Sequence, residues 1–276
     1  MTILKLWFST IARVFANPGA LLVFAISYAF LLIASYIFIW IREATIWQVL
    51  VTYALMILIP IGFFTLQAAI IDRVLDQKFR WRVILIDALK FLVITIPVLL
   101  LAWLLYYLLN KISVRYPAPI ISDQATPTTP SPLHWPTLIF TTLRFVLWGV
   151  AFPLATIHLW IAIAGGEVRG LFRDGVKSFL KRIGSALARA FSPDSVLVYG
   201  LGLIIFVVLP YVILVPAFTI NGNKMEFALF GLRLLLSFLF SLIGWVLTLT
   251  AFVRNVPALP PEVSAPAVAH ATESAA

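Results

Sequence analysis

Six long apolar stretches constrain the fold of this chain more than any other feature. They are Ala20–Ile41, Trp47–Ile71, Phe91–Leu109, Leu138–Ala164, Ser195–Phe218 and Phe227–Phe252. About 20 apolar residues in a helix cross the roughly 30 Å hydrocarbon core of a bilayer. Because unpaired backbone groups are costly in lipid, each stretch is expected to be helical. The sequence therefore predicts an all-α integral membrane protein, with six transmembrane helices in one membrane domain over residues 1–252.

The composition excludes most classes of soluble protein. The 276 residues are 62% hydrophobic and 11% charged, with a mean hydropathy of +1.05. A soluble domain is about 45–50% apolar and about 25% charged. The net charge of +9 is assigned to loops beside the membrane, so no nucleic-acid partner is expected. The chain has no Cys and three widely spaced His residues, so we expect no metal site and no cofactor.

The Lys and Arg residues are distributed unevenly between the two sides of the predicted spans. If the N-terminus is cytoplasmic, 14 of the 20 lie in cytoplasmic segments and four lie in outer loops. Cytoplasmic loops carry an excess of these residues. Both termini are therefore predicted to be cytoplasmic, in the cytoplasmic (inner) membrane of a bacterium. Residues 253–276 are rich in Ala and Pro and are expected to form a disordered cytoplasmic tail.

A basic amphipathic segment precedes the first, third and fifth apolar stretches. The three segments are Thr10–Pro18, Asp87–Phe91 and Ser185–Pro193. Arg13, Lys90 and Arg189 occupy similar places in them, each close to a Phe. This pattern predicts three repeats of an interfacial amphipathic helix followed by a helical hairpin. Convergence is the alternative, since any helix beside a membrane tends to acquire this pattern.

Two arginines, Arg144 and Arg233, lie inside the fourth and sixth apolar stretches. An Arg near the centre of a membrane helix costs about 2.5–3.5 kcal/mol on insertion scales. One reason to retain both is an anionic lipid headgroup held between the two guanidinium groups. The alternative is that each side chain extends separately to the outer headgroups.

Polar and small side chains follow one face of the sixth stretch. They are Arg233, Ser237, Ser241, Gly244 and Thr248, at steps of three or four residues. His158 occupies the same face of the fourth stretch as Arg144. One interpretation is close helix packing, which small residues permit. The other is a cleft for lipid or another amphiphile, lined by His158, Ser237, Ser241 and Thr248.

The segments that lead into the first and fifth spans carry a resemblance. Phe15-Ala-Asn-Pro18 and Phe191-Ser-Pro193 resemble the entry motif of several bacterial six-span membrane families. The layout of the chain is also similar to the membrane domain attached to some glycerophosphodiester phosphodiesterases. The resemblance implies this layout for most of the chain and no catalytic activity.

Two functions fit these features. The chain lacks zinc-protease, serine-hydrolase and nucleotide-binding loop patterns, so we expect no enzyme. The first hypothesis is a scaffold or membrane-organising protein whose partners are the bilayer, anionic headgroups and another membrane protein. The alternative is the membrane subunit of a system that transports lipid or another amphiphile. No apolar stretch carries an internal carboxylate, so that system would need a separate ATPase partner on the basic segments.

Overall fold

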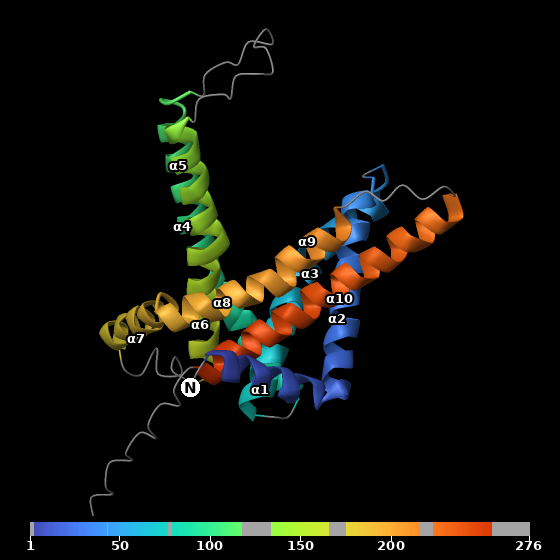
Figure 1. The fold of residues 1–276 in the computed structure, drawn as a ribbon, viewed down its shortest axis with the longest axis horizontal. Helices are drawn as coiled ribbons and strands as arrows, with labels where there is room; N and C mark the ends of the chain where they lie inside the picture. The colour runs from blue at the N-terminus through green and yellow to red at the C-terminus, as the bar shows by residue number, and fades with distance from the viewer. Residues whose placement is uncertain are drawn as a thin grey trace, which may run out of the picture.

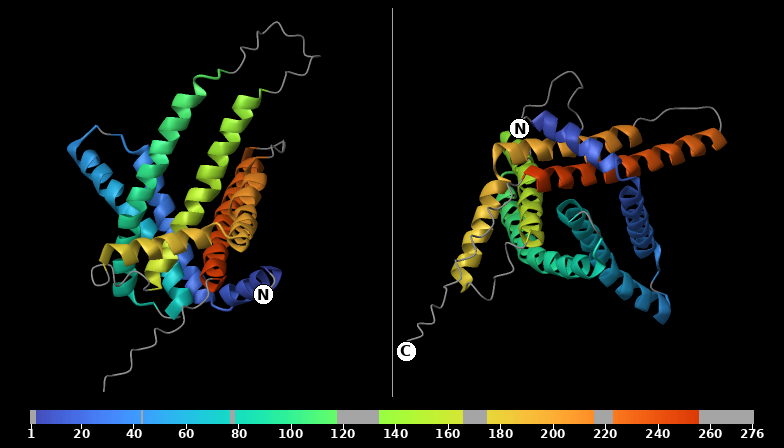
Figure 2. Two further views of the ribbon diagram at one scale, coloured as in Figure 1. Left: turned by 90° about the vertical axis from the view of Figure 1, so that its left-hand side faces the viewer. Right: turned by 90° about the horizontal axis from the view of Figure 1, so that it is seen from below.

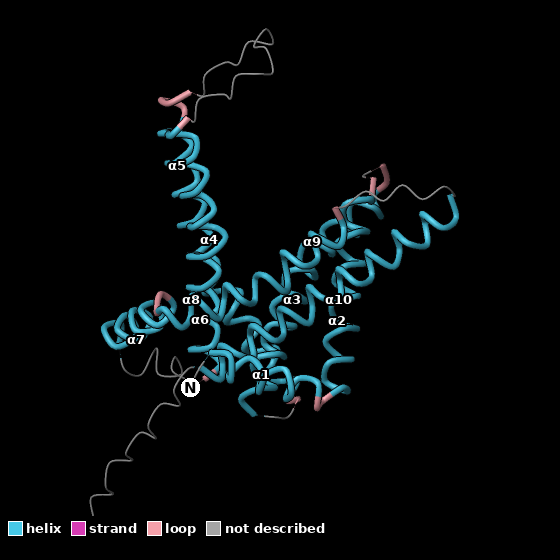
Figure 3. The backbone as a smooth tube through the Cα atoms, in the orientation of Figure 1, coloured by secondary structure: helices cyan, strands magenta, loops and turns pink. Residues whose placement is uncertain are grey.

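The computed structural model describes residues 3–42, 44–76, 79–117, 134–165, 175–215 and 223–255, and all regular structure in these ranges is helical (Figure 3). The helices in chain order are α1 (Ile3–Phe15), α2 (Pro18–Trp40), α3 (Ile46–Asp76), α4 (Trp81–Ser113), α5 (Trp135–Arg144), η1 (Phe145–Ala151), α6 (Phe152–Ala164), α7 (Gly175–Ala190), α8 (Pro193–Leu203), η2 (Ile204–Val208), α9 (Leu209–Leu214) and α10 (Asn223–Asn255). The segments η1 and η2 are π-helical turns inside longer helices.

Six helical runs among the described residues are long and apolar enough to cross a membrane. They are Pro18–Trp40, Ile46–Leu75, Trp81–Ser113, Trp135–Ala164, Pro193–Leu214 and Lys224–Asn255. Each contains or closely matches one predicted apolar stretch. The predicted class, an all-α membrane protein with six helices of spanning length, is therefore confirmed.

Two of the amphipathic segments form separate helices that end just before a proline. α1 is followed by Asn17 and Pro18, and α7 is followed by Ser192 and Pro193. The Ser192 Oγ accepts a hydrogen bond from the backbone N–H of Ser195 and caps α8. Proline suits the first turn of a helix because it has no N–H to leave unpaired. A proline in the first turn therefore starts both the first and the fifth spans, whereas the side-chain cap is made at Ser192 and not at Asn17.

The second amphipathic segment behaves differently from the other two. Asp87–Phe91, expected to be an interfacial helix, lies inside α4, which runs unbroken from Trp81 to Ser113. No proline interrupts this region, and Lys90 Nζ donates to the buried carboxylate of Asp87 one helical turn away. A separate interfacial helix was therefore the wrong expectation here, and the three-fold repeat stays a prediction.

The first three residues of the predicted tail are helical. Residues 253–255 continue α10, and the Arg254 guanidinium donates to Ser9 Oγ at 3.0 Å and Thr10 Oγ1 at 3.2 Å on α1. These bonds hold the last turn of α10 against α1. The rest of the tail, residues 256–276, lies outside the described residues.

The spans form three antiparallel helical hairpins that diverge from one end of the molecule (Figure 1). The first pairs α2 with α3, the second pairs α4 with the α5–α6 run, and the third pairs the α8–α9 run with α10. Figure 2 shows the same divergence from two further directions. α1 packs across α10, and α7 packs against α6, both at the end where the hairpins meet.

Most buried side chains also lie at that end, which we call the base. They cluster in Phe64–Asp72 of α3, Ile84–Thr95 of α4, Leu154–Ile163 of α6 and Leu242–Val253 of α10. Leu6, Trp7 and Thr10 of α1 cover the same core. The halves of the hairpins farther from the base expose large apolar side chains, which is how helix surfaces face lipid.

Candidate functional site

Arg144 lies against the end of α4 that is farthest from the base. Its NH2 nitrogen donates to Asn110 Oδ1 at 2.7 Å and to Ser113 Oγ at 3.2 Å. Its guanidinium carbon lies 6.0 Å from the centre of the Tyr106 ring. A cation is favoured at the C-terminus of a helix, where the backbone carbonyls carry partial negative charge. Arg144 therefore joins α5 to the C-terminal turns of α4.

Arg233 makes an equivalent contact in the third hairpin. Its Nε donates to the carbonyl oxygen of Ile213 at 2.8 Å, near the C-terminal end of α9. The last four carbonyls of a helix have no partner within the helix, so a cation there satisfies an otherwise unpaired acceptor. Arg233 therefore links α10 to the end of α9.

The two arginines thus lie on different hairpins. α5 and the outer half of α10 belong to arms that diverge from the base (Figure 1). Each has its own protein oxygen partners, and the described contacts do not bring the guanidinium groups together. Joint binding of one anionic headgroup stays a prediction. Contacts with helix C-termini explain why both arginines are present inside apolar stretches. The sequence did not reveal these contacts.

The small polar face of α10 packs against the α8–α9 run. Ser237 Oγ donates to the Pro210 carbonyl at 3.3 Å, and Ser241 Oγ donates to the Phe206 carbonyl at 3.2 Å. Phe206 lies in the π-helical turn η2, four residues before Pro210, whose nitrogen has no N–H to donate. A Cβ on Gly244 would come within 2.8 Å of the Phe206 nitrogen. Of the two interpretations of this face, these contacts favour close packing.

His158 and Thr248 lie deeper, in the base. The His158 ring packs edge-on against Phe252 of α10, with centroids 5.3 Å apart. Thr248 Oγ1 donates to the Gly244 carbonyl at 2.6 Å, and its side chain fills the space beside Gly202. Both residues are buried against neighbouring helices. Their part in lining a cleft stays a prediction.

Two tryptophan hydrogen bonds cross the base. Trp245 Nε1 on α10 donates to Gln67 Oε1 on α3 at 2.6 Å. Trp160 Nε1 on α6 donates to Thr95 Oγ1 on α4 at 3.0 Å. Each bond pairs polar groups that would be expensive to leave unsatisfied in an apolar core. The first bond connects the third hairpin to the first, and the second bond joins the two helices of the second hairpin.

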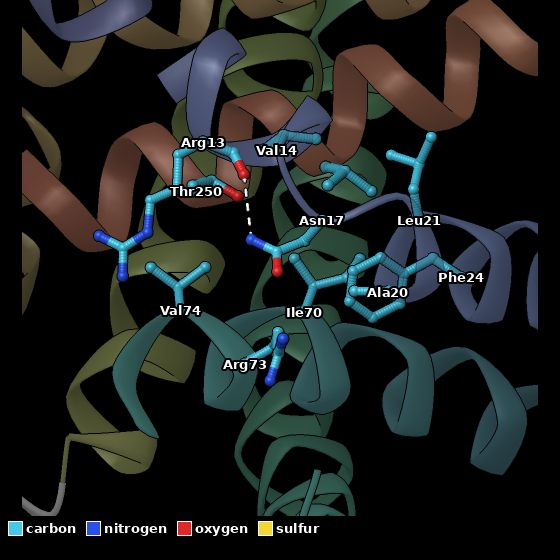
Figure 4. A pocket seen from close by; sticks show the side chains of 11 residues that line it. Arg13, Val14, Asn17, Ala20, Leu21, Phe24, Ile70, Arg73, Val74 and Thr250 are labelled. Atoms are coloured by element: carbon cyan, nitrogen blue, oxygen red, sulfur yellow. Dashed lines mark hydrogen bonds between the residues drawn. The ribbon is translucent and has the colours of Figure 1, made fainter. Parts of the chain in front are cut away.

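A basic pocket opens where α1, α2, α3 and α10 meet, with a volume of about 300 Å³ (Figure 4). Its polar lining comes from Arg13 of α1, Asn17 before α2, Arg73 of α3 and Thr250 of α10. Its apolar lining includes Phe24 and Ile70. Two guanidinium groups beside an apolar wall suit an anion that carries a hydrocarbon portion.

Sequence reasoning missed this pocket. It placed Arg13 in an interfacial segment and Arg73 in a cytoplasmic loop, about 60 residues apart. Their position at the same membrane boundary was the available signal. Their convergence depends on α1 folding back across α10, which no local pattern in the sequence indicates.

Comparison with known proteins assigns no family: no family model, no curated protein and no solved structure matches the chain. Within the described residues, no group of three or more His, Asp or Glu side chains is placed to hold a metal ion. The functional argument therefore depends on the geometry of the chain itself.

Proposed function

We propose that this chain is a non-enzymatic scaffold, a multi-pass protein that organises its surroundings within the membrane. One observation supports this role above the others. The base is held together by buried polar and aromatic contacts, whereas the three hairpins diverge away from it. Spaces between diverging hairpins in a bilayer are filled by lipid or by helices of other membrane proteins. A packed base with separated arms suits a scaffold that seats such helices.

The proposed location is the inner membrane of a bacterium, with both termini in the cytoplasm. The excess of Lys and Arg on one side of the spans supports this orientation. The base, α1 and α7 would then lie at the cytoplasmic boundary. Their amphipathic faces would rest among the headgroups, where basic residues are attracted to anionic lipid.

The transport alternative has less support from the described contacts. It needs a route for an amphiphile and an ATPase partner on the cytoplasmic side. The polar face of α10 uses Ser237 and Ser241 to bond neighbouring backbone carbonyls. Side chains occupied in this way are poorly suited to line a path through the membrane.

Photo-crosslinking in native membranes tests the scaffold proposal. A photoreactive amino acid replaces Ile33 of α2 or Trp103 of α4, which are both exposed on diverging arms, and neither lines the groove between α2 and α3. We expect adducts of discrete mass with another membrane protein. The same reagent at buried Leu249 serves as the control and should give only crosslinks within the chain. Adducts with lipid alone from both exposed positions would contradict a protein scaffold.

Orientation is tested separately with single cysteines in the naturally cysteine-free chain. The two variants are Ala16→Cys and Ala44→Cys. Both positions are exposed, and they lie near opposite ends of α2. An impermeant thiol reagent added to intact cells should label the second variant and spare the first. The reverse pattern would place the base outside the cytoplasm.

A further inference from the structure

We propose that the basic pocket and an adjoining apolar groove form one binding site for a glycerophospholipid with an anionic headgroup. The groove runs between α2 and α3 and has a volume of about 400 Å³. Phe24 lines both the pocket and the groove. The two spaces are thus adjacent, one charged and one apolar. This site does not depend on the scaffold role, because it concerns only the first hairpin and the base.

The pocket supplies the headgroup chemistry. Arg13 and Arg73 are half-buried and come from different helices, and no acidic side chain is among the described residues that line the pocket. Asn17 and Thr250 add polar groups beside them. A phosphate diester accepts bidentate hydrogen bonds from guanidinium groups, and a partly buried setting makes each contact stronger than in water.

The start of α2 adds to this positive environment. Asn17 occupies the N-cap position, yet its side chain makes no capping bond; its Nδ2 instead donates to the Arg13 carbonyl at 3.4 Å. The N-terminus of a helix carries partial positive charge and favours anions. The pocket thus lies beside a helix N-terminus that has no acidic cap.

Aromatic side chains form the boundary between the pocket and the groove. The Arg73 guanidinium carbon lies 5.2 Å from the centre of the Phe79 ring. Phe79 packs edge-on against Phe24 and stacks on Trp81, with centroids 6.0 Å apart in each case. Trp is enriched at the headgroup level of membranes. This cluster therefore marks the depth where a glycerol backbone would lie.

The groove has the chemistry and length for an acyl chain. On α2 its lining runs from Val23 to Ala34, 11 residues apart and so about 16 Å in length. That matches one leaflet, half of the roughly 30 Å hydrocarbon core. Gly62 on α3 keeps the helices close, because a Cβ there would come within 2.8 Å of Leu31 Cδ2. The rest of the lining is almost wholly apolar.

Native mass spectrometry of the full chain in mild detergent tests the site. Dioleoyl phosphatidylglycerol and dioleoyl phosphatidylcholine are the two probes, since they share acyl chains and differ in net charge. We expect wild type to retain phosphatidylglycerol in preference to phosphatidylcholine. Arg13→Gln and Arg73→Gln should each weaken phosphatidylglycerol retention about tenfold, the equivalent of one charge-assisted hydrogen bond. Arg42→Gln removes the same charge at the far end of α2 and should change nothing.

A second pair of variants tests the groove. Ala34→Phe fills the groove, whereas Ala29→Phe adds the same ring to an exposed position of α2. The first should reduce retention of both lipids and the second should not. Glycerol 3-phosphate has the headgroup chemistry without acyl chains. Its competition with the lipid tests whether the pocket instead binds a soluble phosphate compound. If this probe competes fully and Ala34→Phe has no effect, the pocket binds a soluble phosphate and the lipid proposal is wrong.

A measurement on wild type alone guards against variants that fail to fold. Added phosphatidylglycerol should raise the melting temperature more than added phosphatidylcholine does, because a ligand stabilises the state that binds it. Equal shifts from the two lipids would overturn the anionic site. Retention of phosphatidylglycerol at the wild-type level by folded Arg13→Gln and Arg73→Gln would overturn it as well.

Discussion

The base of the molecule and the outer halves of its hairpins are built from similarly apolar helices, yet most of the buried side chains lie in the base. The difference lies in their polar and small residues. The base contains Gln67, Thr95, His158 and Thr248, all buried. Lipid is as apolar as leucine, so apolar faces gain little by leaving it, and packing depends on hydrogen bonds and close backbone approach. The comparison indicates that a few polar contacts decide where these helices meet.

The contacts that do occur farther out follow the same rule. Arg144 bonds Asn110, Arg233 bonds the Ile213 carbonyl, and Ser241 bonds the Phe206 carbonyl. Each joins the two helices of one hairpin. In the base, Trp245 of the third hairpin reaches Gln67 of the first, and Arg254 of the third hairpin reaches Ser9 of α1. Polar bonds therefore hold each arm together without closing the spaces between arms.

The largest contrast is expected from matched leucine truncations in the two regions. Leu249 is 0% exposed in the base, and Leu99 is 61% exposed on α4. Leu249→Ala should lower the unfolding free energy by about 2 kcal/mol or more, because a cavity remains in a packed core. Leu99→Ala should change it by less than about 0.5 kcal/mol. Denaturation in lipid–detergent micelles measures both, and equal losses would contradict the packed-base description.

Overpacking the base should have the next largest effect. A Cβ on Gly202 would overlap Thr248 Oγ1, whereas a Cβ on Gly200 meets no atom within 4 Å. Gly202→Leu should therefore cost about 1–3 kcal/mol. Gly200→Leu, on the same helix, should be neutral or stabilising, because leucine is the better helix former. Thermal unfolding of the two variants compares them directly. A stable Gly202→Leu protein would mean that α8 and α10 do not approach as closely as described.

The sequence was sufficient for the helices and insufficient for their arrangement. Apolar runs predicted six spans because length and hydropathy are local properties. The break between α1 and α2 before Pro18 and the continuity of α4 through Asp87 differ in one local signal, a proline, which could have been weighed more heavily. The pocket of Arg13 and Arg73 needed tertiary information. So did the partners of Arg144 and Arg233, since nothing nearby in sequence marks Asn110 or Ile213.

Removing a single hydrogen bond across the base should lower the unfolding free energy less than a cavity or a clash does. Trp245→Phe removes the donor to Gln67 Oε1 and leaves that oxygen in a buried site. The expected loss is about 1 kcal/mol, between membrane and aqueous estimates for such bonds. Trp103→Phe makes the same change on the exposed surface of α4 and should be neutral. Gln67→Leu should lower the unfolding free energy less in the Trp245→Phe background than in wild type. If it lowers the unfolding free energy equally in both, the bond contributes nothing.

The smallest expected effect is the coupling between Arg144 and Arg233. Each bonds an oxygen on its own hairpin, so Arg144→Gln and Arg233→Gln should each cost roughly 0.6 kcal/mol, the average for hydrogen bonds in a membrane protein. Distant sites without shared partners add to within about 0.3–0.5 kcal/mol, so the double variant should show the sum. A headgroup shared by both guanidinium groups predicts a different result, because the first substitution would already release the lipid. Unfolding of wild type, both single variants and the double variant gives the coupling energy, and native mass spectrometry gives the bound lipid. A coupling above about 1 kcal/mol together with lipid lost from each single variant would show that the two arms meet around one anion, and the separation of the second and third hairpins would then be wrong.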